Sequence, residues 1–465
     1  MVLLCAANAT MGAVKLPSII SDNMVLQRSA QTPLWGNADP GEKVTAKFGD
    51  ASGEAVADAG GKWRLELNLQ DAGESAGELI IAGSNTITIK NAIVGEVWVC
   101  SGQSNMSWNV GETLNVAQEA KDFPGIREFR VSQVIAYQPQ SDIDQGRWVV
   151  ATNDTTPAFT AVGFYFGREL HLKTGQPVGL INSSWGGTDC ESWTSRSQLE
   201  KDGELKAIVA AHDVAMKADP KPPTVAPDNP NQPAVLYNSM IAPLTPYRIK
   251  GAIWYQGESN TGRWKSYEEL LTLMIEGWRS DWGIGDFPFY IVQLANYQAR
   301  DTEPSTDAAW AQVRDAQYNV SKNVPNSGLA TAIDIGEAED IHPRNKQDVG
   351  KRLALIALAK DYGVDVECSG PQFKSLKIEG HQAIVTFDHA KGLNARDGEP
   401  RRFAIAGADG KFVWANARID GDRIIVWSDE VPSPKEVRYG RGQNPEVNVY
   451  NAAGLPLLPF VAVAE

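Results

Sequence analysis

Residues 97–106 constrain the fold of this chain most, because an apolar run stops abruptly at Gly102 and small polar residues follow it. An apolar run that ends in a tight turn is typical of a buried parallel strand. Open α/β sheets bind their ligands at the carboxyl ends of such strands. Ser104 would therefore be either the N-cap of the next helix or a nucleophile at the sheet edge. The second interpretation requires a general base and oxyanion donors from elsewhere in the chain.

From about residue 95 onward, strand-like runs alternate with helix-like runs. The expected strands cover residues 97–100, 178–181, 251–255, 289–294 and 329–335. The expected helices cover residues 164–173, 197–216, 264–282, 308–321 and 345–361. This alternation predicts an α/β fold in which helices cover both faces of a parallel sheet.

The segments on either side of this region contain strand patterns without helices. Strands are expected at residues 33–36, 43–48, 62–67 and 86–90, and again at 377–378, 383–387, 402–405, 423–427 and 436–439. Short strands separated by glycine, proline and aspartate turns are typical of β-sandwiches. We therefore divide the chain into a β domain at 16–94, an α/β domain at 95–364 and a second β domain at 365–465, with a proline-dense surface connection at 219–233.

Length and charge narrow the classes of function. A chain of 465 residues is too long for one ordinary core, so two or three domains are expected. The net charge of −14 argues against nucleic acid or an anionic membrane surface as a partner. No apolar run approaches the length of a membrane span. The 14 tryptophans would serve either as core residues or as platforms for sugar rings.

The first residues and the cysteines allow further expectations. Residues 1–15 resemble the end of a secretory signal without its basic region, which would place the protein in the periplasm or outside the cell. A disordered tail, a cloning remnant or a wrongly chosen start would explain them equally well. Cys100, Cys190 and Cys368 match no zinc-binding spacing. A disulfide between Cys100 and Cys190 and a pair of buried thiols both remain open.

Elimination among five histidines identifies the candidate base. His171 and His212 lie within expected helices, whereas His381 and His389 lie in the C-terminal β region. His342 follows the last expected strand of the sheet and precedes a helix, so it belongs to a loop at the same carboxyl edge as Ser104. Histidine has the pKa that a general base for serine requires.

A third residue would orient the imidazole of His342. Asp340, two positions upstream, is a candidate, and Glu339 and Asp334 are rivals. An aspartate two residues before a histidine would also suit a metal ion. No second histidine or carboxylate cluster accompanies this pair, so no metal is expected.

Two further strand ends would supply donors for an oxyanion. The strand at 178–181 is followed by Gly186 and Gly187, where backbone amides can approach a ligand closely. The strand at 251–255 is followed by the amide side chains of Gln256 and Asn260. Competing serines occur in the same turns but lack the strand-Gly-x-Ser pattern; they are Ser183, Ser184 and Ser259.

Four of these motifs, taken in order, resemble the sialate O-acetylesterase family, a branch of the SGNH hydrolases. They are Gly-Gln-Ser-Asn at 102–105, Trp-Gly-Gly-Thr at 185–188, Trp-Tyr-Gln-Gly-Glu-Ser-Asn at 254–260 and Asp-Ile-His-Pro at 340–343. The stretches 23–28, 237–244 and 437–439 are also similar to that family, so the resemblance begins near residue 16. It implies an SGNH-type, flavodoxin-like sheet.

The resemblance also implies a role for each motif. Ser104 would be the nucleophile and His342 the base, with Asp340 or Glu339 as third member, or none if the pair acts as a dyad. The oxyanion would lie among the N–H of Ser104, a backbone N–H of Gly187 or, less favourably, Gly186, and the side chain of Asn260 or Gln256. Candidate sugar contacts, each with a packing role as its alternative, are Gln103, Trp108, Trp185, Arg314 and Gln317.

The implied reaction is removal of an O-acetyl group from a carbohydrate through an acetyl-enzyme, without a cofactor. The substrate would be an acetylated sialic acid or a plant-type hemicellulose, and the oligomeric state stays open. One alternative is a glycoside hydrolase that pairs Glu258 with Asp340. Another is a carbohydrate-binding protein that has lost activity.

Overall fold

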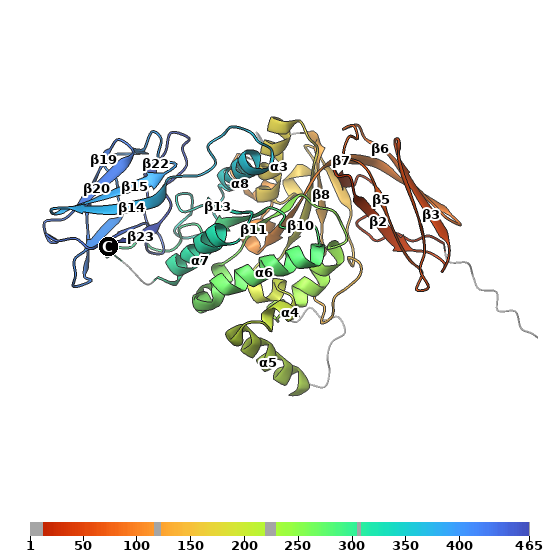
Figure 1. The fold of residues 1–465 in the computed structure, drawn as a ribbon, viewed down its shortest axis with the longest axis horizontal. Helices are drawn as coiled ribbons and strands as arrows, with labels where there is room; N and C mark the ends of the chain where they lie inside the picture. Colours follow the sequence, from red (N-terminus) through yellow and green to blue (C-terminus); the bar gives the residue numbers. More distant parts are fainter. Residues whose placement is uncertain (1–12, 116–121, 219–228, 305–307, 465) are drawn as a thin grey trace, which may run out of the picture.

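A computed structural model describes residues 13–115, 122–218, 229–304 and 308–464. Its central α/β part lies between an N-terminal β part and a C-terminal β part, which occupy opposite ends of the long axis (Figure 1). The predicted signal remnant at 1–15 falls mostly on residues outside the described ranges. The predicted α/β fold with flanking β-rich parts is confirmed.

The central sheet has the strand order β13-β12-β11-β7-β10-β8-β9. Its strands are β7 (Thr86–Gly102), β8 (Phe123–Arg130), β9 (Trp148–Ala151), β10 (Val178–Ser184), β11 (Gly251–Tyr255), β12 (Phe289–Gln293) and β13 (Ser327–Thr331). All neighbours pair in parallel except β8 and β9. The carboxyl ends of β7, β10 and β11 therefore meet at one edge.

Helices cover both faces of this sheet (Figure 1). The longer helices are α3 (Ala161–Thr174), α5 (Gly203–Ala218), α6 (Tyr267–Trp282), α7 (Ala309–Asn323) and α8 (Lys346–Asp361). Alternate residues of β7 serve the two faces, as strand geometry requires. Val97 and Val99 belong to the core that contains α6, whereas Trp98 and Cys100 belong to the core that contains α3 and α8.

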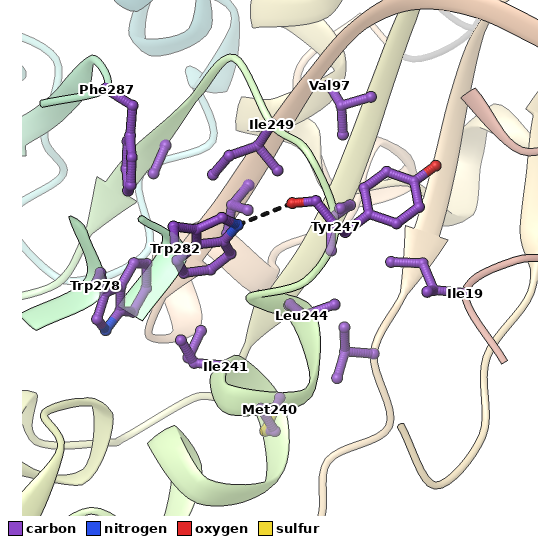
Figure 2. Close-up of a cluster of buried hydrophobic side chains, with 14 of the residues drawn as sticks. Ile19, Val97, Met240, Ile241, Leu244, Tyr247, Ile249, Trp278, Trp282 and Phe287 are labelled. Carbon is purple, nitrogen blue, oxygen red and sulfur yellow. Dashed lines mark hydrogen bonds between the residues drawn. The ribbon is translucent and has the colours of Figure 1, made fainter. Parts of the chain in front are cut away.

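Several tryptophans that could have been sugar platforms are core residues. Figure 2 shows Trp278 and Trp282 of α6 among buried apolar side chains, with Val97 in the same cluster. The indole N–H of Trp282 donates to the carbonyl oxygen of Tyr247 at 3.0 Å. A buried indole with a satisfied donor stabilises a core and has no surface to offer a sugar.

Shorter helical segments connect these elements. They are α1 (Ser104–Ser107), α4 (Arg196–Leu199), η1 (Val110–Glu112), η2 (Thr156–Ala158), η3 (Cys190–Trp193), η4 (Tyr237–Ile241), η5 (Ala242–Leu244) and η6 (Glu258–Ser266). The helix expected at 197–216 is divided into α4 and α5, and the one expected at 264–282 begins only at Tyr267, after η6. No helix in the described part of the chain has both the length and the apolar character needed to cross a bilayer.

The N-terminal β part is joined to the central sheet by one continuous strand. It contains β1 (Val25–Gln27), β2 (Thr32–Asn37), β3 (Lys43–Phe48), β4 (Ala51–Val56), β5 (Lys62–Leu67) and β6 (Gly77–Ala82). The first half of β7 pairs with β6, and its second half pairs with β10 and β11. The expected strands at 86–90 and 97–100 are therefore one strand, and the proposed boundary at residue 94 falls inside it.

The C-terminal β part consists mainly of two four-stranded antiparallel sheets, β14-β15-β20-β19 and β18-β17-β21-β23, around a shared core. The strands are β14 (Gln372–Glu379), β15 (Gln382–Asp388), β16 (Asn394–Ala395), β17 (Phe403–Ala406), β18 (Phe412–Trp414), β19 (Asn416–Asp420), β20 (Arg423–Trp427), β21 (Glu436–Tyr439), β22 (Val449–Tyr450) and β23 (Phe460–Val463). This part lies at the opposite end of the molecule from the N-terminal one (Figure 1).

Candidate active site

The turn after β7 presents Ser104 at the carboxyl edge of the sheet. Gly102 has a φ of +128°, and a Cβ there would overlap the backbone carbonyl of Tyr255. Glycine is required because it alone adopts this conformation at such a close approach. The N-cap of α1 is Gln103, so Ser104 is the first helical residue and its hydroxyl does not cap the helix. The N-cap interpretation of Ser104 is wrong.

The hydroxyl of Ser104 contacts the predicted base directly. His342 Nε2 lies 2.9 Å from Ser104 Oγ. The indole of Trp108 stacks on the imidazole, with ring centroids 4.7 Å apart and an interplanar angle of 28°. The imidazole therefore has a fixed orientation, with one nitrogen on the serine.

The surroundings of His342 favour its neutral form. Partial burial lowers the pKa of His342 below its ordinary value, and the nearby charge of Lys346 lowers it further. The carboxylate of Asp340 acts in the opposite direction but does not cancel these effects. A neutral imidazole can accept the proton of a serine hydroxyl, which is what a general base must do.

Of the three acidic candidates, Asp340 lies beside the imidazole. Its Oδ1 accepts the backbone N–H of His342 at 2.8 Å and lies 3.5 Å from His342 Nδ1. Glu339 is exposed to solvent. Asp334 forms a paired contact with Arg352 at 2.6 and 2.8 Å, which holds it away from the histidine. The position of Asp340 suits the third role, although 3.5 Å is longer than an ordinary hydrogen bond.

The glycine turn after β10 lies against the serine. Ser184 and Gly102 are partners in the β10–β7 register, and the N–H of Trp185 donates to the carbonyl of Gly102 at 3.1 Å. A Cβ on Gly186 would lie 3.3 Å from the Cβ of Ser104. Gly187 has a φ of +73°. Within the described residues, neither glycine amide has an acceptor, so both remain available to an oxyanion.

The amide cluster after β11 differs from the prediction. The two N–H groups of Gln256 donate to the carbonyl of Thr188 at 3.1 Å and to Asn260 Oδ1 at 2.6 Å. The proposal of Gln256 as an oxyanion donor is therefore wrong, because no N–H is left. Asn260 accepts from the N–H of Cys190 and donates one N–H to Glu191 at 2.8 Å. The second N–H of Asn260 is not used in these bonds, so the role of Asn260 as an oxyanion donor remains a prediction.

Two of the five candidate sugar contacts are wrong. Arg314 is fully buried, and its guanidinium donates to four backbone carbonyls, two after β12 and two in the loop before β22. Gln317 is also fully buried and bonds the backbone of Leu294 and Gln256. Both side chains connect elements inside the protein, so neither can reach a sugar.

The other three candidates line the site in different ways. Gln103 is 3% exposed, and its Oε1 accepts the N–H groups of Gly257 and Ser259 at 3.3 Å each. Its amide nitrogen has no partner among the described residues. Trp108 and Trp185 are both half-buried. Sugar contact by these three residues remains a prediction.

The sequence reasoning missed a buried polar network beside Ser104 and His342. Lys346 Nζ donates to Asn105 Oδ1, and Asn105 Nδ2 donates to Glu258 Oε1 at 2.5 Å. A signal was present, because Lys346 places a cation in the first turn of a predicted helix, where the helix dipole disfavours it. The sequence analysis assigns Glu258 a role only as half of a glycosidase pair.

A cleft with a mixed polar and apolar lining lies near the site. Its volume is about 1010 Å³, and Ser107, one helical turn after Ser104, lies on its wall. The other polar residues of the lining are Glu128, Arg130, Ser132, Gln133, Gln145, Arg147, Asp154, Thr155, Asn182 and Ser184. A cleft of this size is large enough to hold a sugar.

The predictions for the cysteines and for a metal site can also be compared with the structure. Cys100, Cys190 and Cys368 are free thiols, so the Cys100–Cys190 disulfide does not form. Burial raises the pKa of the Cys100 and Cys190 thiols well above its ordinary value, which keeps them protonated and unreactive. Within the ranges that the structure describes, no group of three or more histidine, cysteine or acidic side chains could hold a metal ion.

Comparison with known proteins shows that this chain is similar to acetylesterases. A family model described as "Carbohydrate esterase, sialic acid-specific acetylesterase" matches residues 94–359. Sialate O-acetylesterase from Mus musculus is 28% identical over 442 residues, which cover 84% of this chain and 82% of that protein. The Homo sapiens sialate O-acetylesterase is 28% identical over 431 residues, covering 84% and 80%. The crystal structure of a carbohydrate acetylesterase from Xanthomonas citri is 37% identical, with a TM-score of 0.85, and covers 97% of this chain and 100% of that one.

Proposed function

The chain belongs to the carbohydrate esterase family of sialic acid-specific acetylesterases, and on that premise we propose that it removes O-acetyl groups from carbohydrates with Ser104 as its nucleophile. The observation that carries the proposal is the 2.9 Å contact between Ser104 Oγ and His342 Nε2. Because the neutral form of His342 is favoured, its Nε2 can accept the hydroxyl proton of Ser104.

The first half of the reaction forms an acetyl-enzyme. His342 Nε2 accepts the hydroxyl proton while Ser104 Oγ attacks the acetyl carbonyl carbon, which places negative charge on the carbonyl oxygen. The intermediate collapses, the bond to the sugar oxygen breaks, and that oxygen takes the proton from the imidazolium. The deacetylated sugar leaves, and the acetyl group stays on Ser104.

The second half uses the same residues with water as the nucleophile. His342 accepts a proton from water, the resulting hydroxide attacks the acetyl carbon, and Ser104 leaves with the proton from His342. Acetate is the second product. In both halves the negative oxygen would lie among the N–H groups of Ser104 and Gly187, or the adjacent Gly186, and the side chain of Asn260.

The structure favours this mechanism over hydrolysis by paired carboxylates. A glycosidase needs two carboxyl groups that face each other across the sugar. Glu258 is 7% exposed, and its Oε1 is already bound to Asn105. Burial also raises the pKa of Glu258. A carboxyl group that is buried and already hydrogen-bonded stabilises the protein structure and does not act on a glycosidic bond.

A parallel assay tests the proposal and narrows the substrate. Acetate release would be measured on O-acetylated sialic acid, acetylated xylan and acetylated xyloglucan with the purified chain, Ser104→Ala and the exposed control Ser375→Ala. We expect release from at least one substrate by the parent and the control, and a loss of about 10³-fold or more in Ser104→Ala. Wild-type release by Ser104→Ala would contradict the proposal.

A further inference from the structure

We propose that Lys346, acting through Asn105, positions Ser104 and His342 for the reaction without touching the substrate. This inference rests on the proposed function of the Ser104–His342 pair. It concerns a buried network that the reaction steps themselves do not use. The network joins three loops that leave the carboxyl edge of the sheet, those after β7, β11 and β13.

Asn105 is the centre of this network. It directly follows the nucleophile and is 1% exposed. Its Nδ2 donates both to Glu258 Oε1 at 2.5 Å and to the backbone carbonyl of Ile341 at 3.0 Å, and its Oδ1 accepts from Lys346. Ile341 directly precedes His342. One amide side chain therefore links the backbone beside the nucleophile to the backbone beside the base.

Lys346 determines how that amide is oriented. A carboxylate accepts hydrogen bonds and an ammonium group donates them. With Glu258 on one side and Lys346 on the other, Asn105 must direct its nitrogen toward Glu258 and Ile341 and its oxygen toward Lys346. Without the lysine the amide loses the donor that fixes its oxygen.

A second contact path leads from Lys346 to the base. The side chain is fully buried, and Nζ lies 5.7 Å from the ring centroid of Trp108 and 5.5 Å from that of Tyr255. Trp108 stacks on His342 at 4.7 Å. An ammonium group over an aromatic face is attracted to it. Lys346 thus holds both the amide beside Ser104 and the indole that fixes the plane of His342.

The position of Lys346 is costly for the fold. It is the first residue of α8, where the positive end of the helix dipole repels a cation. Burial lowers the pKa of Lys346 to about 7. The acidic groups that act on it in the other direction are Glu258 from η6, with Asp340 and Glu337 from its own loop. The helix dipole and burial both disfavour a charged lysine here, so stability alone does not explain its presence.

The charge of Lys346 also has a defined effect on the base. The groups that act on His342 are Lys346, which lowers its pKa, and Asp340 and Glu112, which raise it. Lys346 is protonated below pH of about 7, which includes the range in which His342 titrates. Removal of the charge must therefore raise the pKa of His342 and move the acid limb of kcat/KM to higher pH.

The test replaces Lys346 with methionine, which keeps the length of the apolar stem. The control is Lys351→Met, an exposed lysine of the same helix. We expect Lys346→Met to lower kcat about 10- to 100-fold with little change in KM, since misplacement of reacting groups has this cost. The acid limb moves to higher pH in this variant only. A kcat within about twofold of the parent, or an unmoved acid limb, would overturn the inference.

A second variant covers failure of Lys346→Met to fold. Glu258→Gln keeps an acceptor for Asn105 but removes the carboxylate that stabilises the lysine charge. We expect a lower kcat and an acid limb shifted in the same direction, and an unchanged profile counts against the inference. Ser104→Ala distinguishes a failure of the positioning role from a failure of the proposed function. If it is inactive while both network variants behave as the parent, only the positioning role fails; if it is fully active, the proposed function fails.

Discussion

His342 Nε2 lies 2.9 Å from Ser104 Oγ, although 238 positions separate the two residues in the chain. Ser104 follows β7 in the middle of the sheet, whereas His342 follows β13 at its edge. The loop after β13 therefore crosses the ends of β12 and β11 to reach the serine. The bond from Asn105 to the carbonyl of Ile341 fixes the end of that loop. The pair is a product of the sheet topology and of this loop.

The pH dependence of the reaction follows from the environment of His342. Burial and the charge of Lys346 lower its pKa from the ordinary 6.5, so the base stays neutral to a lower pH than a free histidine. We expect the acid limb of kcat/KM, where His342 becomes protonated, to be centred below pH 6.5. A steady-state pH profile measures this directly. An acid limb centred above that value would contradict the assignment.

A matched pair of variants tests whether Asp340 or Glu339 is the third member that orients His342. The carboxylate of Asp340 lies 3.5 Å from His342 Nδ1 and raises the pKa of the histidine. Asp340→Asn removes this carboxylate and therefore lowers that pKa. We expect kcat to fall by about tenfold or more and the acid limb to move to lower pH. Glu339→Gln changes an exposed side chain and should leave both unchanged. The reverse pattern would make Glu339 the third member.

The turn that presents Ser104 depends on Gly102. Alanine there would combine a φ of +128° with an overlap on the carbonyl of Tyr255. We expect Gly102→Ala to lower the free energy of unfolding by more than about 2 kcal/mol and to reduce activity. Gly73→Ala, which meets nothing within 4 Å, is the control and should change stability by less than about 0.5 kcal/mol. Chemical denaturation compares the two; equal stability would show that the turn tolerates a side chain.

Arg314 tests the corrected role of a residue first expected to bind sugar. It lies inside the protein and donates to four backbone carbonyls, and burial lowers its pKa to about 9. Arg314→Met leaves those carbonyls without a donor, so we expect a loss of about 3–5 kcal/mol in unfolding free energy. The exposed Arg418→Met is the control. A raised KM with unchanged stability would restore the sugar-binding role.

The sequence sufficed for the elements that carry the reaction. Apolar runs followed by turns that contain Gly102, Gly186 and Gly257 mark the strand ends. Burial on both faces and tight turns leave a pattern that needs no tertiary information. Elimination among the histidines led to His342, which the structure places 2.9 Å from Ser104 Oγ. Each alternative lay in a helix or outside the sheet, and His342 alone occupied a loop at the right edge.

What the sequence could not show is the direction of polar side chains within buried elements. β8 contains Arg127 and Glu128, which are 2% and 3% exposed, and a charged pair inside a strand hides the strand from pattern analysis. Arg314 and Gln317 lie on a helix face whose partners are backbone carbonyls from distant segments. Lys346 is buried against Asn105, Trp108 and Tyr255, which lie far from it in the sequence. Each outcome is decided by tertiary contacts and not by local spacing.

The central claim is that Ser104 carries the acetyl group, and trapping of the intermediate tests it most directly. The enzyme would be mixed with excess 4-nitrophenyl acetate, quenched in acid within the first turnover and digested for peptide mass spectrometry, with Ser104→Ala treated in parallel. The account predicts one acetyl group on the peptide that contains Ser104 in the parent and none on that peptide in the variant. Rapid turnover with no acetyl group on Ser104, or with the group on another residue, would contradict it.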